Sequence, residues 1–377
     1  MKLKPGISGP LRVLVIGRFS SIHTFRFSEE LQRQGLDVAA LWIGPAKSRP
    51  NVRIYHAERS MRLCGVPRTA IFRSLLFVRR AISDFSPDII HIQDEARFPQ
   101  WLNLVCPPNI LRAYTSWGHN PGLKNVSSFR RGLAKMDLLT SDAPDVLDEI
   151  TSLAPRASHE IVRFGADLDL FHPGPPDDTI LAQYRLDPNG MYVISPRSLR
   201  PIYNQLTLIR ALPPVVERFP NLQLILKHHH VENYGDSSDY ETQVRNEAKR
   251  LKLWDRVVRV DHIPYSHQCH LYRLCRAAVS IPLEDAFPST IFEAMASGCP
   301  LVVSNDRSYE GVIMDGTNSV SISPTDTAAL SRALLRILSD SDFAEALRTN
   351  ALETVTEKGD FKKEIKRLIR TYQVLSS

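Results

Sequence analysis

The chain has 377 residues, with 47 lysines and arginines against 41 aspartates and glutamates, a formal charge of +6 and 43% hydrophobic residues. That length suffices for two domains with cores of their own, and the composition excludes a small disulfide scaffold, an intrinsically disordered chain and a strongly basic nucleic-acid-binding protein. No run of about 18 apolar residues marks a membrane-spanning helix, and the five cysteines include no C-x2-C pair. We therefore expect a protein of the reducing cytoplasm.

Short apolar, β-branched runs alternate with helical periodicity from the start of the chain. A helix is predicted at 25–34, ending before Gly35, and strands are predicted at 13–16, 37–42, 89–92 and 137–140. After a proline-rich break at 173–176, a second series of strands is predicted at 192–195, 222–226, 257–260, 278–281 and 301–304. This alternation predicts two α/β halves, each with a mostly parallel sheet, and the apolar spacing of residues 362–375 predicts a terminal helix.

The segment after the strand at 278–281 carries the clearest chemical signal. It reads E-D-A-F-P-S-T-I-F-E-A-M-A-S-G-C-P over residues 284–300. Open parallel sheets bind ligands beyond the carboxyl ends of their strands, so this position favours a site. The loop and the helix that starts in it offer free N–H groups to a phosphate, while the carboxylates of Asp285 and Glu293 can accept hydrogen bonds from sugar hydroxyls. The alternative is a solvated loop acid and a glutamate that only complements the helix dipole.

Residues 285–303 resemble the E-x7-E region of the family-4 (group 1) retaining glycosyltransferases of the GT-B fold. Asp285 stands for the first glutamate of that region and Ala286 for a glycine. Segments similar to those of the same family continue along nearly the whole chain, at 19–24, 87–91, 163–171, 259–280 and 310–324.

The resemblance implies a fold and a domain organisation. It implies an α/β chain with two Rossmann-like domains facing across a cleft. The acceptor-side domain would comprise residues 1–170 and a C-terminal helix at about 361–377 that packs back on it. The nucleotide-sugar-binding domain would comprise residues 171–360.

The resemblance also assigns residues to the donor. In this family the second glutamate holds the nucleotide ribose, and the first acidic residue contacts the donor sugar together with the backbone that follows it. Carried over, these catalytic-site roles fall to Glu293 and Asp285, with the donor also contacted by Ala286, Phe287, Pro288 and Ser289. The shorter aspartate could alter the choice of sugar.

The family's diphosphate is bound by an arginine and a lysine in a segment of the form G-R-L-x-x-x-K-G. Arg197 matches the arginine, but Tyr203 stands where the lysine is expected. A site without metal must supply positive charge to the leaving diphosphate. Arg200 and Lys227 are the candidates for that second donor-binding cation, and an ordinary surface cation is an equally good interpretation of each.

The acceptor side is implied by two loops. Residues 116–121, S-W-G-H-N-P, take the place of the family's H-G-x-D segment, and the first loop contributes around residues 19–20. The acceptor-side residues are then Phe19, Ser20, Trp117, Gly118 and Asn120. Either His119 takes a catalytic polar role near the anomeric carbon, or this chain does without such a residue.

No metal site is expected. The D-x-D pattern at 167–169 has the form used by metal-dependent transferases, but the resemblance places it in the turn between the domains. The three histidines at 228–230 alternate sides in an extended segment and cannot easily converge on one ion. His91 is expected to be a core histidine of its strand.

The function implied is that of a retaining, metal-independent hexosyltransferase. It would move a sugar from a nucleotide-diphosphate sugar, its co-substrate, to a hydroxyl of a saccharide or lipid-linked acceptor, in polysaccharide or glycolipid biosynthesis and with no cofactor. Two alternatives stay open: a catalytically degenerate GT-B protein that binds nucleotide sugars as a partner, and a nucleotide-sugar 2-epimerase.

The positive charge belongs to the first half of the chain. Residues 1–170 carry 23 lysines and arginines against 16 acidic residues, and the remainder carries 24 against 25. Seven arginines face a single acid within 51–80. A basic amphipathic surface there could dock on an anionic membrane from its cytoplasmic face and reach a lipid-linked acceptor. An ordinary helix with a buried apolar face and solvated arginines explains the pattern equally well.

Overall fold

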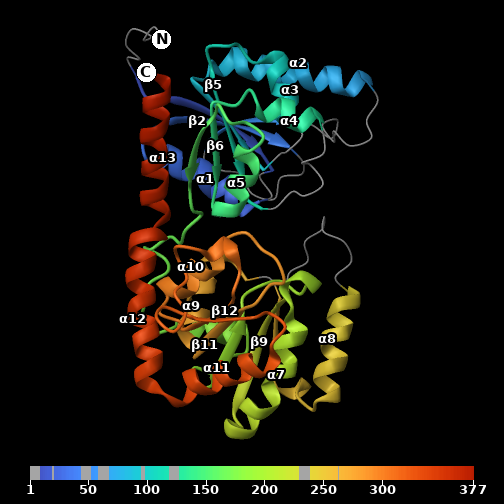
Figure 1. Cartoon of the computed structure of the whole chain (residues 1–377), viewed down its shortest axis with the longest axis vertical. Helices are drawn as coiled ribbons and strands as arrows, with labels where there is room; N and C mark the ends of the chain where they lie inside the picture. The colour runs from blue at the N-terminus through green and yellow to red at the C-terminus, as the bar shows by residue number, and fades with distance from the viewer. Residues whose placement is uncertain are drawn as a thin grey trace. The chain divides into compact units, whose positions relative to one another are not determined.

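A computed structural model describes residues 9–18, 21–43, 52–57, 68–94, 98–118, 127–228, 238–261 and 263–377. The chain divides into two compact units (Figure 1). The first unit is Met1–Phe164 together with Lys362–Ser377, and the second is Gly165–Phe361.

The first unit is built on a seven-stranded sheet in which every pairing is parallel. Its strand order is β3-β2-β1-β4-β5-β6-β7. The strands are β1 (Arg12–Gly17), β2 (Asp37–Ile43), β3 (Arg53–Ala57), β4 (Ile89–Gln93), β5 (Leu111–Ser116), β6 (Leu138–Ser141) and β7 (Ser158–Ile161). The helices are α1 (Ile22–Arg33), α2 (Arg68–Phe85), α3 (Phe98–Val105), α4 (Ser127–Leu133), α5 (Pro144–Thr151) and α13 (Phe361–Ser376).

The second unit is built on a six-stranded sheet, again with parallel pairing throughout. Its strand order is β10-β9-β8-β11-β12-β13. The strands are β8 (Met191–Ser195), β9 (Leu222–His228), β10 (Val257–Asp261), β11 (Ala277–Ser280), β12 (Leu301–Ser304) and β13 (Val320–Ile322). The α-helices are α6 (Asp178–Gln183), α7 (Gln205–Arg218), α8 (Ser238–Arg250), α9 (Tyr265–Leu274), α10 (Ser289–Ala296), α11 (Thr327–Ser339) and α12 (Ser341–Lys358).

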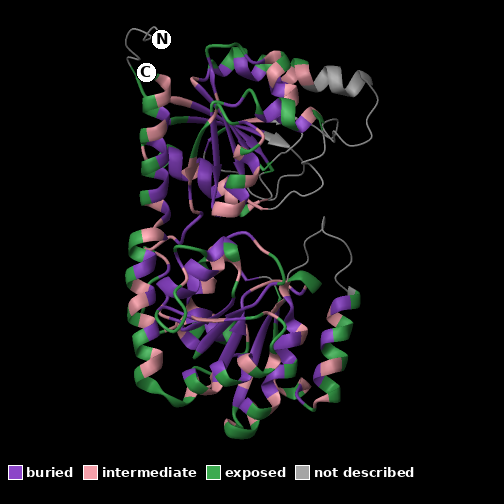
Figure 2. Ribbon diagram, in the orientation of Figure 1, coloured by how far each residue is buried: buried purple, intermediate pink, exposed green. Residues whose placement is uncertain are grey.

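The apolar runs of the sequence form the buried central strands of both sheets (Figure 2). Parallel strands covered on both faces have continuous rather than alternating apolar sequences, which is why these strands could be predicted. Four strands were not predicted, namely β3, β5, β7 and β13. The central strand β5 was missed because its sequence, L-R-A-Y-T-S, is not a continuous apolar run, and the other three lie at the edges of their sheets. An edge strand is only partly buried and tolerates polar residues, as the S-H-E-I sequence of β7 illustrates.

The boundary between the units lies six residues earlier than the sequence predicted, at 164/165 rather than 170/171. The physical reason is that residues 165–170 are tied to the second unit. The N–H of Ala166 donates to the Gly359 carbonyl oxygen at 2.8 Å, and Arg273 donates to the Leu170 carbonyl oxygen at 3.1 Å. The residue that follows this segment, Phe171, is fully buried against the rings of Tyr265 and Tyr272.

The terminal helix α13 packs on the first unit, as expected. The Arg163 N–H donates to the Glu364 carboxylate at 2.9 Å, and the Arg367 guanidinium donates to Glu160 at 2.7 Å. These contacts join the last helix to the strand β7 and the residues that follow it.

His91 is a core residue of β4, as the sequence predicted, with no exposed surface. Its neighbours Ile90 and Ile92 enter the apolar cluster on one face of the sheet. On the other face the imidazole meets the Phe27 ring of α1 edge-on, hydrogen-bonds the Tyr372 hydroxyl of α13 through Nδ1, and contacts the Thr115 hydroxyl of β5 at 2.5 Å through Nε2. Burial lowers the pKa of His91 to about 3.

The described half of the basic helix α2 is an ordinary amphipathic helix. Val78, Ala81, Ile82 and Phe85 are buried in the core of the first unit, whereas Arg79 and Arg80 are exposed. The side chains of residues 68–74, at the start of α2, lie outside the described part of the chain, and so does the whole of segment 58–67. No helix in the described part of the chain is both long and apolar enough to cross a membrane.

Replacing Gly165 with alanine should destabilise the second unit. An added Cβ would collide with the backbone carbonyl of Gly359, which cannot move without breaking its bond to Ala166. Overpacking of this kind costs about 1 to 3 kcal/mol. Thermal unfolding measures the loss, and Gly9→Ala is the matched control because nothing lies within 4 Å of its added Cβ. Equal melting temperatures for the two variants would contradict the close crossing.

His91 should make the first unit sensitive to acid. The unfolded histidine binds a proton below about pH 6.5, but the buried one does so only near pH 3, so its contribution to stability is complete above pH 6.5 and falls as the pH decreases. The unfolding free energies of the wild type and of His91→Gln should converge on acidification, by up to about 1.4 kcal/mol per pH unit. The control is His159→Gln, which changes an exposed histidine of β7. A difference that stays constant from pH 7 to pH 5 would refute the assignment.

Candidate functional site

The segment predicted to carry the chemistry joins β11 to β12 at the carboxyl edge of the second sheet. Residues 281–288 form the loop, and α10 begins at Ser289 after Pro288, whose extended backbone starts the helix. The helix ends before Gly298, whose φ of +72° is a left-handed conformation that glycine adopts without strain. Glu293 lies in α10 with 2% of its surface exposed, and its carboxylate accepts a hydrogen bond from the Ser289 hydroxyl at 3.0 Å. This glutamate is therefore held inside the site and does not complement a solvated helix end.

The loop acid Asp285 forms an ion pair with Arg197. Arg197 follows β8, and its Nη2 lies 2.7 Å from the Asp285 carboxylate, with side-chain exposures of 13% and 17%. Burial alone would lower the pKa of Arg197, but the charge of Asp285 and the contact with Tyr203 hold it above its ordinary value. Two residues that are 88 positions apart in the sequence are thus brought together, as the resemblance required.

Tyr203 stands where the family's lysine was expected, and its ring covers the guanidinium of Arg197. The Arg197 Cζ lies 4.0 Å from the centre of the Tyr203 ring, a cation–π geometry. Arg200 lies over the same ring at 5.5 Å and is only partly buried. Tyr203 therefore orients the arginine that the sequence assigned to the diphosphate.

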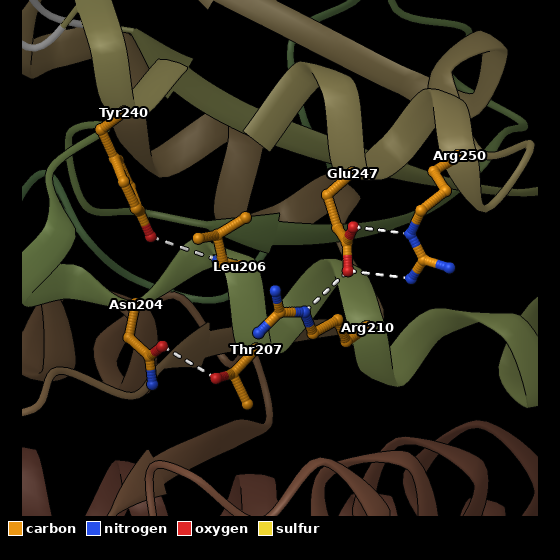
Figure 3. A network of polar contacts seen from close by, with 7 residues as sticks. All are labelled: Asn204, Leu206, Thr207, Arg210, Tyr240, Glu247 and Arg250. Carbon is orange, nitrogen blue, oxygen red and sulfur yellow. Dashed lines mark hydrogen bonds and ion pairs between the residues drawn. The ribbon is translucent and has the colours of Figure 1, made fainter. Parts of the chain in front are cut away.

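The turn that carries Arg197 and Tyr203 ends at Asn204, and hydrogen bonds hold Asn204 and the start of α7 in place (Figure 3). Asn204 adopts a left-handed backbone, and its side chain accepts from the Thr207 hydroxyl at 2.8 Å and donates to the Pro324 carbonyl at 2.6 Å. The next turn is tied to α8 because the Leu206 N–H donates to the Tyr240 hydroxyl at 3.2 Å. Farther along the same two helices, Glu247 accepts from Arg250 and Arg210, which lowers the pKa of its carboxyl to about 2.

Lys227 is one of the two candidates for a second donor-binding cation. It lies near the end of β9, and its ammonium donates to the Gln268 side chain at 3.1 Å. Burial lowers the pKa of Lys227, the negative charge of Glu293 opposes that shift, and the positive charge of Arg197 adds to it. Lys227 is thus within electrostatic reach of both residues, and it is partly buried, as Arg200 is.

The structure adds two tyrosines that the sequence did not single out as site residues. The Tyr272 hydroxyl of α9 is buried, has no hydrogen-bond partner within the described part of the chain and lies within the field of Glu293. Tyr309 is buried against the ring of Phe287, 5.4 Å between centres, and Phe287 stacks on Phe292 at 4.6 Å. Tyr272 lies in the segment 259–280 that carried part of the resemblance, and this was the one signal for it in the sequence.

The predicted donor residues Ala286, Phe287 and Pro288 are buried in the loop, and Ser289 is partly buried. These residues can therefore offer mainly backbone groups to a ligand. The N–H of Ala286 is already directed at the Asp285 carboxylate, 3.1 Å away.

In the first unit, Trp117 and Gly118 follow β5 and are both partly exposed. The Trp117 ring lies 5.5 Å from the His23 ring in a stacked arrangement and 5.5 Å from the Phe164 ring edge-on. The other predicted residues of this side lie outside the described part of the chain; they are Phe19, Ser20, His119 and Asn120.

Within the described residues, no group of three His, Cys, Asp or Glu side chains could hold a metal ion. Asp167 accepts from the N–H of Asp169 at 3.2 Å, so the D-x-D pattern forms a local turn. His229 and His230 lie outside the described residues.

A protein-family model, "Glycosyl transferases group 1", matches residues 176–354. This segment belongs to the group 1 glycosyl transferases. It contains Arg197, Lys227, Asp285 and Glu293, and therefore the whole set of charged side chains described above.

Curated relatives match somewhat less than half of the chain. An uncharacterized glycosyltransferase of Methanocaldococcus jannaschii is 27% identical over 167 residues, 44% of this chain and 40% of the relative. The phosphatidyl-myo-inositol mannosyltransferase of Mycobacterium tuberculosis is 25% identical over 173 residues, 45% of this chain and 43% of the relative. The matched regions thus span about two fifths of the length of these relatives.

Solved structures match nearly the whole chain. A sucrose-phosphate synthase of Thermosynechococcus elongatus has a TM-score of 0.78 at 18% identity, covering 97% of this chain and 99% of its own. The HepE protein of Anabaena, in complex with UDP and glucose, has a TM-score of 0.77 at 14% identity, covering 97% and 100%. The likeness shows the two-domain α/β fold of the GT-B glycosyltransferases, as the sequence predicted.

Proposed function

We propose that this chain is a retaining glycosyltransferase that moves a hexose from a nucleoside-diphosphate sugar to an acceptor hydroxyl without a metal ion. The observation that carries the proposal is the convergence of Arg197, Lys227, Asp285 and Glu293 at the carboxyl edge of one parallel sheet. Two partly buried cations suit a diphosphate, and two carboxylates suit the hydroxyls of a ribose and a sugar.

Each residue has a role in this proposal. Glu293, held by Ser289, accepts hydrogen bonds from the ribose hydroxyls. Arg197 and Lys227 bind the diphosphate, and Asp285 exchanges its pairing with Arg197 for the hydroxyls of the sugar. Burial lowers the pKa of Lys227, and an anionic diphosphate beside it would favour its charged form.

The reaction would proceed with retention. The nucleoside diphosphate leaves with the electrons of the glycosidic bond, and the two cations stabilise the charge that develops on it. The leaving phosphate accepts the proton of the acceptor hydroxyl, which attacks the anomeric carbon from the same face. A second catalytic carboxylate is then unnecessary.

The first unit would bind the acceptor, with Trp117 and Gly118 at the carboxyl end of β5. We propose a saccharide or lipid-linked acceptor, a role in polysaccharide or glycolipid biosynthesis and a cytoplasmic location. The relative named a phosphatidyl-myo-inositol mannosyltransferase supports the lipid-linked acceptor. Because the described half of α2 buries its apolar face, contact with an anionic membrane would depend on exposed arginines such as Arg79 and Arg80.

Removing either Arg197 or Glu293 should abolish transfer while leaving the protein folded. Arg197→Ala and Glu293→Ala should each lower the rate of UDP release from UDP-glucose, with saccharides and glycolipids offered as acceptors, by about 100-fold or more. Glu284→Ala is the matched control, because Glu284 is an exposed acid next to Asp285. Full activity in either test variant, with an unchanged melting curve, would refute the site.

Binding measurements can distinguish the contributions of Lys227 and Arg200 to UDP affinity. Lys227→Met should weaken UDP binding by about tenfold or more, because it removes a charge that interacts with both Arg197 and Glu293 and that we assign to the diphosphate. Arg200→Met should change it by less than about threefold, because Arg200 lies over the Tyr203 ring and is not assigned to the diphosphate. Calorimetric titration with UDP measures both, and the reverse order would assign the second cation to Arg200.

Two other functions predict different results. A degenerate GT-B protein would be stabilised against heat by a nucleoside diphosphate but would neither hydrolyse nor transfer the donor sugar. An epimerase would convert the nucleotide sugar without an acceptor. A thermal-shift panel of UDP-, GDP- and ADP-sugars, followed by product analysis for the best ligand, distinguishes the three.

A further inference from the structure

The indole of Trp117 is held by a buried glutamine on the neighbouring strand. Its Nε1 donates a hydrogen bond of 2.8 Å to Oε1 of Gln93, the last residue of β4. Gln93 is 1% exposed, whereas Trp117 is partly exposed. The partly exposed indole of Trp117 is therefore held in place by the buried side chain of Gln93.

The orientation of the Gln93 amide is determined by its neighbours. An indole N–H can only donate, so the amide oxygen must face Trp117 and the amide nitrogen must face away. That nitrogen lies 3.4 Å from the Thr115 hydroxyl, a buried acceptor on β5. Both sides of the amide are thus used, and rotating it would lose both contacts.

Thr115 continues the network to the C-terminal helix. Its hydroxyl contacts His91 Nε2 at 2.5 Å and Thr140 at 2.6 Å, and His91 Nδ1 contacts the Tyr372 hydroxyl of α13. One consistent assignment of the protons is that Tyr372 donates to Nδ1, Nε2–H donates to Thr115, and Thr115 donates to Thr140. The remaining lone pair of Thr115 then accepts from Gln93.

Other contacts fix the indole in the same position. His23 stacks on it with an interplanar angle of 23°, and the edge contact with Phe164 has an angle of 77°. The backbone N–H of Trp117 lies 3.4 Å from Asp94 Oδ1. An indole fixed in this way loses little conformational entropy when a flat ligand stacks on it.

We propose that Gln93 is a positioning residue that holds Trp117 as a stacking surface for a saccharide ring of the acceptor. The C–H face of a pyranose is apolar, and an aromatic ring is the side chain that covers such a face most completely. The assignment of the acceptor to this edge rests on the proposed function, but the hydrogen-bond chain from Gln93 to Tyr372 does not.

The first test is spectroscopic and needs no ligand. The four tryptophans give four indole N–H signals in an NMR spectrum of indole-labelled protein, and Trp117→Phe identifies the signal of Trp117. In Gln93→Leu this signal alone should move upfield and exchange its proton faster, while those of Trp42, Trp101 and Trp254 stay in place. Gln93→Glu should keep the signal, because a carboxyl oxygen still accepts from the indole. Gln100→Leu, a partly buried glutamine of α3, is the control.

The second test measures binding. Methyl α-mannoside and methyl α-glucoside are titrated into the wild type, and at least one should shift the Trp117 signal. In Gln93→Leu the dissociation constant should rise about tenfold, the loss expected for one hydrogen bond, and in Tyr372→Phe it should rise less. UDP affinity should be unchanged in both variants, since Gln93 and Tyr372 belong to the first unit.

The proposal is overturned if the Trp117 signal is unaffected by Gln93→Leu, or if neither glycoside shifts it in the wild type. A purely structural role for Gln93 would lower the melting temperature without moving the Trp117 signal selectively. Failure of the proposed function looks different, because it would appear as an absence of UDP binding or transfer with the Gln93 results intact.

Discussion

Parallel pairing of every strand constrains both units in the same way. A parallel strand can be reached only by a crossover, so all strands of a sheet end at the same edge and each is followed there by a loop. Arg197 after β8, Lys227 at the end of β9 and Asp285 after β11 are neighbours for this reason. In the first unit, Gln93 at the end of β4 meets Trp117 after β5 through the same geometry.

Removing four charged groups partly or wholly from water costs free energy unless each has an opposite charge or a hydrogen-bond partner. The pair of Arg197 and Asp285 satisfies this condition directly, and the Tyr203 ring further stabilises the guanidinium. Lys227 and Glu293 are compensated less closely, through Gln268 and Ser289, and the lowered pKa of Lys227 is the result. In a site of this kind the positive and negative charges offset one another. An anionic ligand that brings hydrogen-bonding oxygens to both cations would bind favourably there.

The sequence predicted what is encoded locally. Continuous apolar runs predicted the central strands other than β5, and the pattern from Asp285 to Gly298 predicted the loop and the helix that carries Glu293. It could not predict contacts between residues far apart in the chain whose types allow several interpretations. His91 was expected in the core, but nothing near it in sequence indicated that its partner would be Tyr372, 281 residues later. The polar edge strands and the unit boundary at residue 164 were missed because tertiary contacts, not local composition, define them.

Tyr203 shows how a departure from a family pattern can be compensated elsewhere in a fold. A lysine at this position would add a flexible charge to the turn after β8. The tyrosine instead supplies a rigid face that, with Asp285, orients Arg197, while in the proposed site the second positive charge comes from Lys227 on the adjacent strand β9. The proposed site therefore has two cations. Arg197 is fixed by the Tyr203 ring and the ion pair with Asp285, and Lys227 is positioned near the end of β9. Because a strand end moves less than a turn, this arrangement exchanges the adaptability of the usual lysine for a more rigid geometry.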